Sequence, residues 1–208
     1  MIYAENILIC ISVPLIVALF FIEGSAKRFA ASFLIGMLIC LISAYISGFI
    51  DLASGMGDED TAVFISPIVE EIMKFLPLLF YLLMFDPGDD NVYLSALGIG
   101  TGFATFENCC YILTAGADKL IYIMIRGMAV GVMHIVSILA LALVICVSRR
   151  FRVMSLSALL GALSFSVIFH GLYNLLVSEP GLSSFIGYVM PLLTAIFMYF
   201  PFKKTKTL

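Results

Sequence analysis

The sequence predicts an all-α protein, a polytopic bundle of transmembrane helices with about seven spans. Of its 208 residues, 62% are hydrophobic and only 12% are charged, about half the charged fraction of a typical soluble domain. A bilayer admits only helices or closed barrels, because every backbone polar group must be bonded internally. The apolar stretches are long and continuous rather than alternating, so helices are favoured over a barrel.

Short polar loops and turns separate seven apolar stretches. We expect helices over about 6–22, 29–50, 62–85, 92–113, 120–147, 153–177 and 185–200. The segments 86–91 and 178–181 are rich in Asp, Asn, Pro and Gly, which is typical of turns. Residues 1–208 are expected to form one integral membrane domain, with its functional core over about 62–177.

The distribution of lysine and arginine predicts the orientation of the bundle. If the spans alternate, eight of the eleven basic residues fall on one side: Lys27, Arg28, Arg149, Arg150, Arg152, Lys203, Lys204 and Lys206. The other side has only Lys119 and Arg126, and Arg126 is expected to snorkel to the outer interface. The N-terminus is therefore expected outside and the C-terminus in the cytoplasm.

Six ionisable residues remain inside the expected spans, where such groups are costly and usually functional. They are Glu70, Glu71, Lys74, Glu107, His134 and His170, and the two histidines are the only ones in the chain. At about 1.5 Å per residue, the glutamate pair lies ~15 Å from the outer end of its helix and the groups on the other three helices lie ~10–11 Å from theirs. Four helices thus place polar groups in one layer of the outer half, whereas chance placement would scatter them.

Spacing by four residues puts further side chains on the same helix faces as these groups. The sets are Phe103, Glu107 and Tyr111 on one helix, and His170 and Asn174 on another. Glu70 and Lys74 are also four apart and can form an ion pair. Tyr111 and Asn174 have an alternative role as hydrogen-bonding groups between helices.

Two local patterns predict backbone features. Ser66 followed by Pro67 fits a helix start, with Ser66 as N-cap. Gly127 and Gly131 form a small-xxx-small face for close helix packing, and the glycines at 98, 100 and 102 indicate the same.

Carboxylates and imidazoles gathered in one layer suit the activation of water. Either a carboxylate acts as general base, or His and Glu hold a zinc-like divalent ion that activates its bound water. Asn or His donors then stabilise an oxyanion. The residues therefore favour hydrolysis of an amide within or near the membrane.

Two other classes of function stay open at this point. Buried Glu and His also serve as relays in a proton- or cation-coupled transporter or channel. Such a protein is expected to show internal repeats and broken helices, and no obvious repeat is seen. The other class is a non-catalytic membrane scaffold, in which the polar groups are structural.

The motifs, taken in order, resemble those of the PrsW family of intramembrane proteases. They are Glu70-Glu71-x-x-Lys74, Phe103-x-x-x-Glu107, a helix with His134, and His170-x-x-x-Asn174. They cover the central four helices, about half of the chain. The family belongs to a superfamily with the type II CAAX prenyl endopeptidases and bacteriocin-processing proteins. The chain departs from the CAAX group at Lys74, where that group has a later arginine, and at Glu107, where it has a histidine.

The resemblance implies an intramembrane endopeptidase, multi-pass in the bacterial cytoplasmic membrane. Its expected partners are the lipid bilayer and a single-span membrane protein substrate, with no nucleic acid. In this family the substrate is typically an anti-sigma factor cut first on its extracytoplasmic side, which starts a stress-response cascade that releases a sigma factor. The layer of polar groups in the outer half agrees with that side.

The resemblance also implies roles for individual residues. Glu70 is the general base with Glu71 as its partner, and the reverse assignment is the alternative. His170 and Asn174 are the oxyanion donors. Glu107 and His134 orient water or bind a metal. A divalent ion such as zinc, if used, takes Glu107, His134 and His170 with Glu70 or Glu71, and the supporting residues are Lys74, Phe103 and Tyr111.

Overall fold

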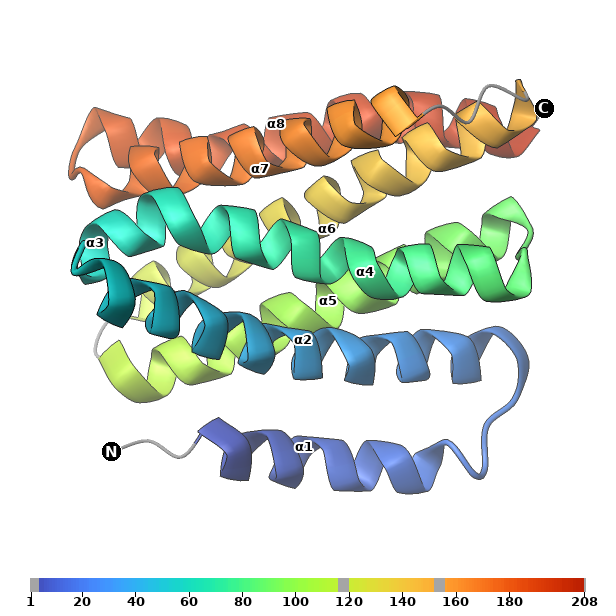
Figure 1. Ribbon diagram of the computed structural model, residues 1–208, viewed down its shortest axis with the longest axis horizontal. Coiled ribbons are helices and arrows are strands. Elements are labelled where there is room, and N and C mark those ends of the chain that lie inside the picture. The colour runs from blue at the N-terminus through green and yellow to red at the C-terminus, as the bar shows by residue number, and fades with distance from the viewer. Residues whose placement is uncertain (1–3, 116–119, 152–155, 208) are drawn as a thin grey trace.

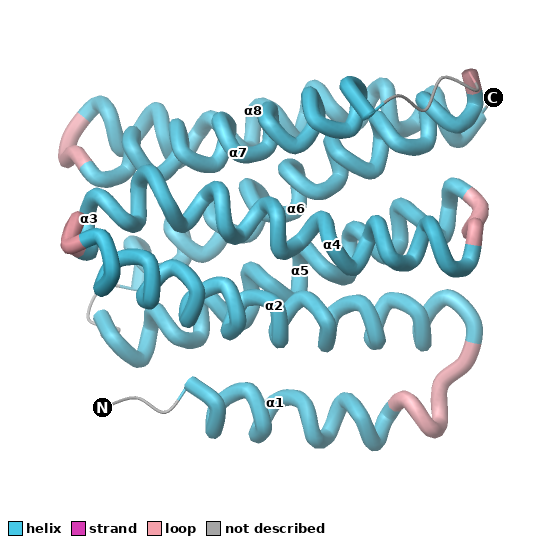
Figure 2. Tube along the Cα trace, in the orientation of Figure 1, coloured by secondary structure: helices cyan, strands magenta, loops and turns pink. Residues whose placement is uncertain are grey.

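The computed structural model describes residues 4–115, 120–151 and 156–207, which are helical almost throughout and contain no strand (Figure 2). The long helices in this part of the chain are α1 (Ala4–Ala18), α2 (Gly24–Ser54), α4 (Ser66–Phe85), α5 (Asp89–Ala115), α6 (Leu120–Arg150), α7 (Leu156–Ser178) and α8 (Leu182–Thr207). Two short elements, α3 (Asp58–Asp60) and η1 (Thr61–Ile65), precede α4. The long helices lie side by side, and each corresponds to one expected span (Figure 1). The all-α prediction is confirmed.

The surface of the bundle suits a lipid environment. Four segments are long and apolar enough to cross a membrane: Gly24–Ser54, Ile123–Arg150, Leu156–Ser178 and Leu182–Phe200. Large apolar side chains point outward along the helices, among them Phe49, Phe80 and Ile168, each at least 60% exposed. Such a surface is unfavourable in water and normal in hydrocarbon. The chain is a helical membrane bundle.

Several helices extend beyond their expected ends. Because α2 begins at Gly24, Lys27 and Arg28 lie in its first turns rather than in a loop. Likewise, α5 begins at Asp89, so that Asp89 and Asp90 lie at the positive end of the helix dipole. The expected basic tail continues α8 to Thr207. Hydropathy alone did not show these extensions, because polar residues at helix ends carry no apolar signal.

The expected turns are found where polar residues cluster. Asp86 ends α4 in a left-handed conformation with φ 39°, and Gly181 between α7 and α8 has φ 95°. Left-handed backbone favours Gly, Asn and Asp. The loop residues 116–119, which include Lys119, and Arg152 with the expected helix start at 153 lie outside the described residues.

Glycines bring α2 and α5 into close contact. A Cβ on Gly36 would lie 2.1 Å from the carbonyl oxygen of Ile99, and one on Gly102 would lie 2.0 Å from that of Phe33. The prediction of close packing at the glycines of the fourth span is therefore confirmed. This contact fixes α5, which lies against α2, α4 and α6 and carries Glu107.

The other glycine prediction is wrong. A Cβ added to Gly131 would meet no described atom within 4 Å, and one added to Gly127 would lie 3.8 Å from the side-chain nitrogen of Asn108. The spacing of two glycines indicates a smooth face, but α6 meets its neighbour at Gly127 through the Asn108 side chain, which donates to the Gly127 carbonyl at 3.3 Å, and not through closely packed backbones.

Basic side chains gather at one end of the bundle. Arg28 donates to Oδ1 of Asn91 at 2.6 Å. Arg149 donates to Asp86 at 2.5 Å and to the carbonyl of Pro87 at 2.7 Å, which ties α6 to the α4–α5 turn. This end also holds the C-terminus, and α3 lies at the opposite end (Figure 1).

The chain is already helical before Ser66, so the predicted N-cap is wrong. Ser66 has helical φ and ψ of −55° and −44°, and its N–H bonds the carbonyl of Thr61, five residues back, in a π-helical turn. In this pattern the partner of the Ala62 carbonyl would be Pro67, which has no N–H. The Asn174 amide on α7 donates to that carbonyl instead, at 2.9 Å. The π-turn thus accommodates a proline within a longer helix and links it to α7.

Candidate active site

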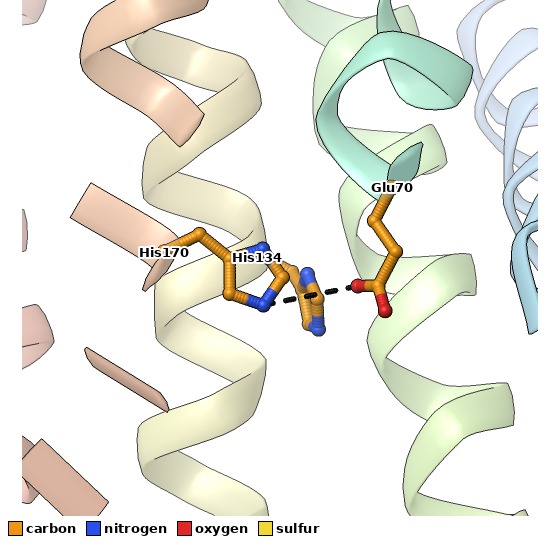
Figure 3. Close-up of side chains that lie close together, drawn as sticks. All are labelled: Glu70, His134 and His170. Carbon is orange, nitrogen blue, oxygen red and sulfur yellow. Dashed lines mark ion pairs between the residues drawn. The ribbon is translucent and has the colours of Figure 1, made fainter. Parts of the chain in front are cut away.

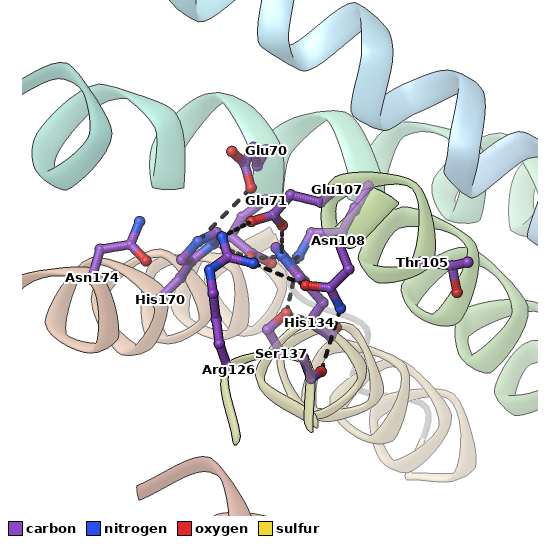
Figure 4. A network of polar contacts seen from close by, with 12 residues as sticks. Glu70, Glu71, Thr105, Glu107, Asn108, Arg126, His134, Ser137, His170 and Asn174 are labelled. Atoms are coloured by element: carbon purple, nitrogen blue, oxygen red, sulfur yellow. Dashed lines mark hydrogen bonds and ion pairs between the residues drawn. The ribbon is translucent and has the colours of Figure 1, made fainter. Parts of the chain in front are cut away.

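Four helices bring the predicted polar groups together in one cluster (Figure 4). Glu70 and Glu71 come from α4, Glu107 from α5, His134 from α6 and His170 from α7. Direct contacts join them across helices, as described below. The expectation that separate helices place these groups at one depth is confirmed.

The innermost part of the cluster is built around the Lys74 ammonium, whose side chain is 1% exposed. Its Nζ lies 2.6 Å from Oε1 of Glu71, 3.1 Å from Nδ1 of His134 and 3.2 Å from Oγ of Ser137. We call Glu71, Lys74 and Ser137 the inner layer. Phe103 packs beside it, with its ring 4.7 Å from the His134 ring and 5.1 Å from Nζ of Lys74.

Lys74 pairs with Glu71 rather than with Glu70, the partner that a spacing of four residues also allows. Residues three and four apart both share a helix face, so the spacing on α4 allows either pairing. The acceptors on α6 decide between them, because they draw the ammonium to the same side as Glu71.

Glu70 faces a different environment from its neighbour. Its Oε2 lies 3.8 Å from Nε2 of His170, which the dashed line in Figure 3 marks. This oxygen is buried and has no hydrogen-bond partner within the described ranges. The other ring nitrogen of His170, Nδ1, lies 2.8 Å from Oε1 of Glu71. The ring of His170 therefore stands between the two glutamates.

Arg126 is part of the cluster, so the expectation that it snorkels to the interface is wrong. It lies 3.5 Å from Oε1 of Glu107, donates to Oδ1 of Asn108 at 2.9 Å, and stacks 3.3 Å above the Tyr111 ring. The other carboxylate oxygen of Glu107 bonds Nε2 of His134. We call Glu70, Glu107 and Arg126 the cavity wall.

Arg126 and Asn108 are the site residues that sequence reasoning missed. An arginine near the end of a membrane helix usually extends to the interface. For this reason Arg126 was not expected to take part in the site. A usable signal was present, because only four residues separate the end of α5 from the start of α6, so the two ends must lie close together. Arg126 is then level with Glu107.

The charges of the cluster do not balance. Three carboxylates face two cations, and each cation lies next to one carboxylate: Lys74 next to Glu71, and Arg126 next to Glu107. Within the described part of the chain, Glu70 contacts only a histidine among the groups that can be positive. It is the one carboxylate of the cluster without a permanent counter-charge.

A cavity of about 700 Å³ reaches this cluster from the end of the bundle that holds α3. Its lining includes Glu70, Glu107, Arg126, His170 and Asn174, together with the exposed residues Glu59, Asp60 and Glu179 nearer the surface. Glu71 and Lys74 lie behind it. A pocket of this volume is in the range of ligand sites.

The residues present fit a metal ion. Glu70, His134 and His170 each offer one ligand atom, and these atoms lie within 4.8 Å of one another. Glu70 also has the buried oxygen without a hydrogen-bond partner. Glu and His are suitable ligands for catalytic zinc. Of the other predicted ligands, Glu71 bonds Nδ1 of His170 and lies behind that ring, where carboxylates orient metal-binding histidines, whereas Glu107 bonds Nε2 of His134.

The chain matches the family described as PrsW family intramembrane metalloprotease over residues 25–201. Comparison with curated proteins and with solved structures gives no match. The matched range contains every residue of the cluster, and the chain belongs to this family. It is therefore a peptidase of the membrane, which favours hydrolysis over transport as the use of the buried Glu and His.

Proposed function

We propose that this PrsW family member hydrolyses a peptide bond of a single-span membrane protein near the extracytoplasmic face, and that Glu70 activates the water. The polar cluster, the cavity that reaches it and the membership of a peptidase family support this proposal.

The position of Glu70 in the cavity lining is the observation that carries the assignment. A general base must hold a proton acceptor near the reacting atoms. Glu71 is bonded by Lys74 and by His170, and it lies outside the cavity lining. Glu70 lines the cavity and keeps a buried oxygen free of hydrogen bonds in the described structure. The choice between the two neighbouring glutamates therefore favours Glu70.

Glu70 and His170 together suit the binding of one water molecule. Nε2 of His170 faces Glu70, 3.8 Å from its Oε2, and in a neutral ring whose Nδ1 donates to Glu71 this Nε2 is a second acceptor. A water that donates one hydrogen to each acceptor keeps its lone pairs for attack. The resemblance assigns His170 to the oxyanion instead, but its place beside Glu70 fits the water better.

The proposed reaction conserves atoms and protons. The water oxygen attacks the scissile carbonyl carbon while Glu70 takes its proton, which gives a tetrahedral oxyanion. The C–N bond then breaks, and the leaving amine receives the proton from Glu70. The Asn174 amide has a second hydrogen beside the one given to Ala62, and Arg126 lines the same cavity; both are donors for the oxyanion.

The family description implies a metal, and we infer zinc held by Glu70, His134 and His170. When bound, such an ion lowers the pKa of its water and polarises the carbonyl. His134 has both ring nitrogens in contact, with Lys74 and with Glu107. To hold the ion through Nε2, His134 would give up the hydrogen on that atom and its bond to Glu107.

The distribution of charge supports a side of the membrane for the cavity, and the family resemblance supports a class of substrate. Basic residues lie at the end of the bundle opposite the cavity, and the positive-inside rule places that end in the cytoplasm. The cavity then opens outside, in the bacterial cytoplasmic membrane. The family resemblance supports an anti-sigma factor as substrate, with the first cut starting a stress response.

Replacing Glu70 with Gln tests the assignment. Single-span anti-sigma factors tagged at both ends are reconstituted with the purified protein in proteoliposomes, and cleavage is followed by mass spectrometry. Loss of a general base costs about 100- to 10,000-fold in rate, so Glu70→Gln is expected to lose cleavage to that extent. Metal content of the same samples shows whether zinc co-purifies and whether the substitution lowers it.

A matched control is Glu23→Gln, which makes the same change in the exposed α1–α2 loop. It is expected to cleave like the unaltered protein. If Glu70→Gln also cleaves at the full rate, Glu70 is not the base, and full loss in Glu71→Gln alone would move the assignment to its neighbour.

A further inference from the structure

Each of the two histidines of the site is held by a contact at its Nδ1 atom. Nδ1 of His134 lies 3.1 Å from Nζ of Lys74, and Nδ1 of His170 lies 2.8 Å from Oε1 of Glu71. The same Oε1 of Glu71 lies 2.6 Å from Nζ of Lys74. One buried ion pair on α4 therefore touches the imidazoles of both α6 and α7.

The hydrogen bonds of the lysine are fully matched. An ammonium has three N–H donors and no acceptor, and three acceptors surround Nζ: Glu71, Nδ1 of His134 and Oγ of Ser137. The Ser137 hydroxyl can accept from Lys74 because its own hydrogen goes to the carbonyl of His134, at 3.0 Å. With its side chain 1% exposed, Lys74 has no need of water as a partner.

This matching assigns the hydrogens on the two rings. Next to a donor-only ammonium, Nδ1 of His134 is an acceptor and carries no hydrogen, so its Nε2 carries one and donates to Glu107. Next to the Glu71 carboxylate, Nδ1 of His170 is a donor and carries a hydrogen. The lysine and its glutamate thus impose opposite hydrogen positions at the two Nδ1 atoms.

We propose that Lys74 is the positioning residue of the site: it holds His134 directly and His170 through Glu71, and so turns the Nε2 atom of each ring toward the cavity wall. Nε2 of His134 then meets Glu107, and Nε2 of His170 meets Glu70. Lys74 itself does not line the cavity.

The consequence for the reaction rests on the proposed function. With Lys74 in place, His170 presents an acceptor to the water beside Glu70, and His134 presents a donor toward Glu107. Without it, the His134 ring loses its anchor and Glu71 loses its counter-charge. Partners that orient reacting groups in this way typically contribute about 10- to 100-fold.

Nitrogen-15 NMR of histidine-labelled protein, stripped of metal by a chelator and held in lipid nanodiscs, tests the inference without any substrate. The chain has two histidines, both in the site, so the spectrum holds four ring nitrogens, and His134→Asn assigns them. One ring is expected to have a bare, hydrogen-bonded Nδ1 and the other a protonated Nδ1. If both rings carry their hydrogens in the same arrangement in the unaltered protein, the inference is overturned.

Two variants extend the test. Lys74→Met removes the donors, and the Glu71→Gln/Lys74→Met double variant removes both charges while the glutamine oxygen still accepts from His170. In either variant the His134 signals are expected to shift, whereas the His170 signals stay in place in the double variant. Lys27→Met, the same change on an exposed lysine, is expected to leave all four signals unchanged.

Unchanged His134 signals in a folded Lys74 variant would refute the positioning role. Where the single variant does not fold, the double variant and the unaltered protein decide. In the cleavage assay Lys74→Met is expected to lower kcat about 10- to 100-fold with little change in KM. If the NMR pattern holds and no substrate is cut by any form, the proposed function fails and the positioning role stands.

Discussion

The inner layer and the cavity wall lie side by side but handle charge in different ways. The inner layer of Glu71, Lys74 and Ser137 is shut off from solvent, and each donor of its lysine has an acceptor. The cavity wall is partly open: Glu107 is 30% exposed and Glu70 18%. There a carboxylate is left without a permanent counter-charge.

Helix geometry produces this difference from two adjacent residues. Successive residues of an α-helix are rotated by about 100°, so Glu71 points to the packed interior of the bundle while Glu70 points to the cavity. A charge in the interior must be paired, because desolvation is costly. A charge at the cavity can remain uncompensated, which is what a reactive group requires. The inner layer therefore holds the site residues in place, and the cavity wall provides the reactive group.

The largest expected effect outside catalysis is a loss of stability on breaking the inner layer. Glu71→Ala leaves the Lys74 ammonium buried without its carboxylate, which is expected to cost about 3–5 kcal/mol in unfolding free energy. Unfolding in mixed micelles measures this cost. The Glu71→Gln/Lys74→Met variant is expected to regain most of it, since removing both charges leaves neither unpaired. If Glu71→Ala is as stable as the unaltered protein, the inner layer is not the ordered region described.

A smaller effect, on activity rather than stability, is expected from the cavity wall. Arg126→Met removes the counter-charge of Glu107 and the stack on Tyr111. Cleavage is expected to fall about 10- to 100-fold, while unfolding free energy changes by about 1 kcal/mol or less because the pair is partly exposed. Arg126→Lys keeps the charge but not the planar fork, so an intermediate rate is expected. A loss of stability as large as that of Glu71→Ala would erase the contrast between the two regions.

The smallest effect is expected from Ser166, which is 1% exposed and donates to the carbonyl of Ser137 at 2.9 Å. This bond joins α7 to α6 just behind the inner layer. Ser166→Ala is expected to lower the unfolding free energy by about 0.5–1.5 kcal/mol and to leave the cleavage rate unchanged. A marked fall in cleavage would extend the functional region beyond the cavity wall.

Much of the fold was predictable because a membrane helix is recognised in a sequence by the length of its apolar stretch. The long helices and the turns at Asp86 and Gly181 follow from composition and local propensity. Depth along each helix was enough to bring Glu107, His134 and His170 to the glutamate pair. What helps here is the bilayer, which restricts each span to nearly the same direction.

The partners within the cluster were harder to predict, because they depend on which helices lie next to each other. Spacing on α4 permits Lys74 to pair with either glutamate, and only the position of Ser137 and His134 on α6 decides. Arg126 was assigned to the interface by the usual behaviour of its residue type. Pro67 was taken to mark a helix start, whereas the preceding turn widens to accept it.

That widened turn has a consequence for how the sequence can vary among homologous chains. A π-turn is equivalent to one residue inserted into an α-helix, and such insertions are frequent at functional sites. The insertion leaves the Ala62 carbonyl for the Asn174 amide, 112 positions away in the chain. The extra residue near 61–65 and the asparagine in α7 are thus expected to vary together. In a homologous chain without the extra residue, the carbonyl left unbonded by the proline lies four residues before it and at a different angle around the helix, so an asparagine at the equivalent place has no reason to persist for this bond.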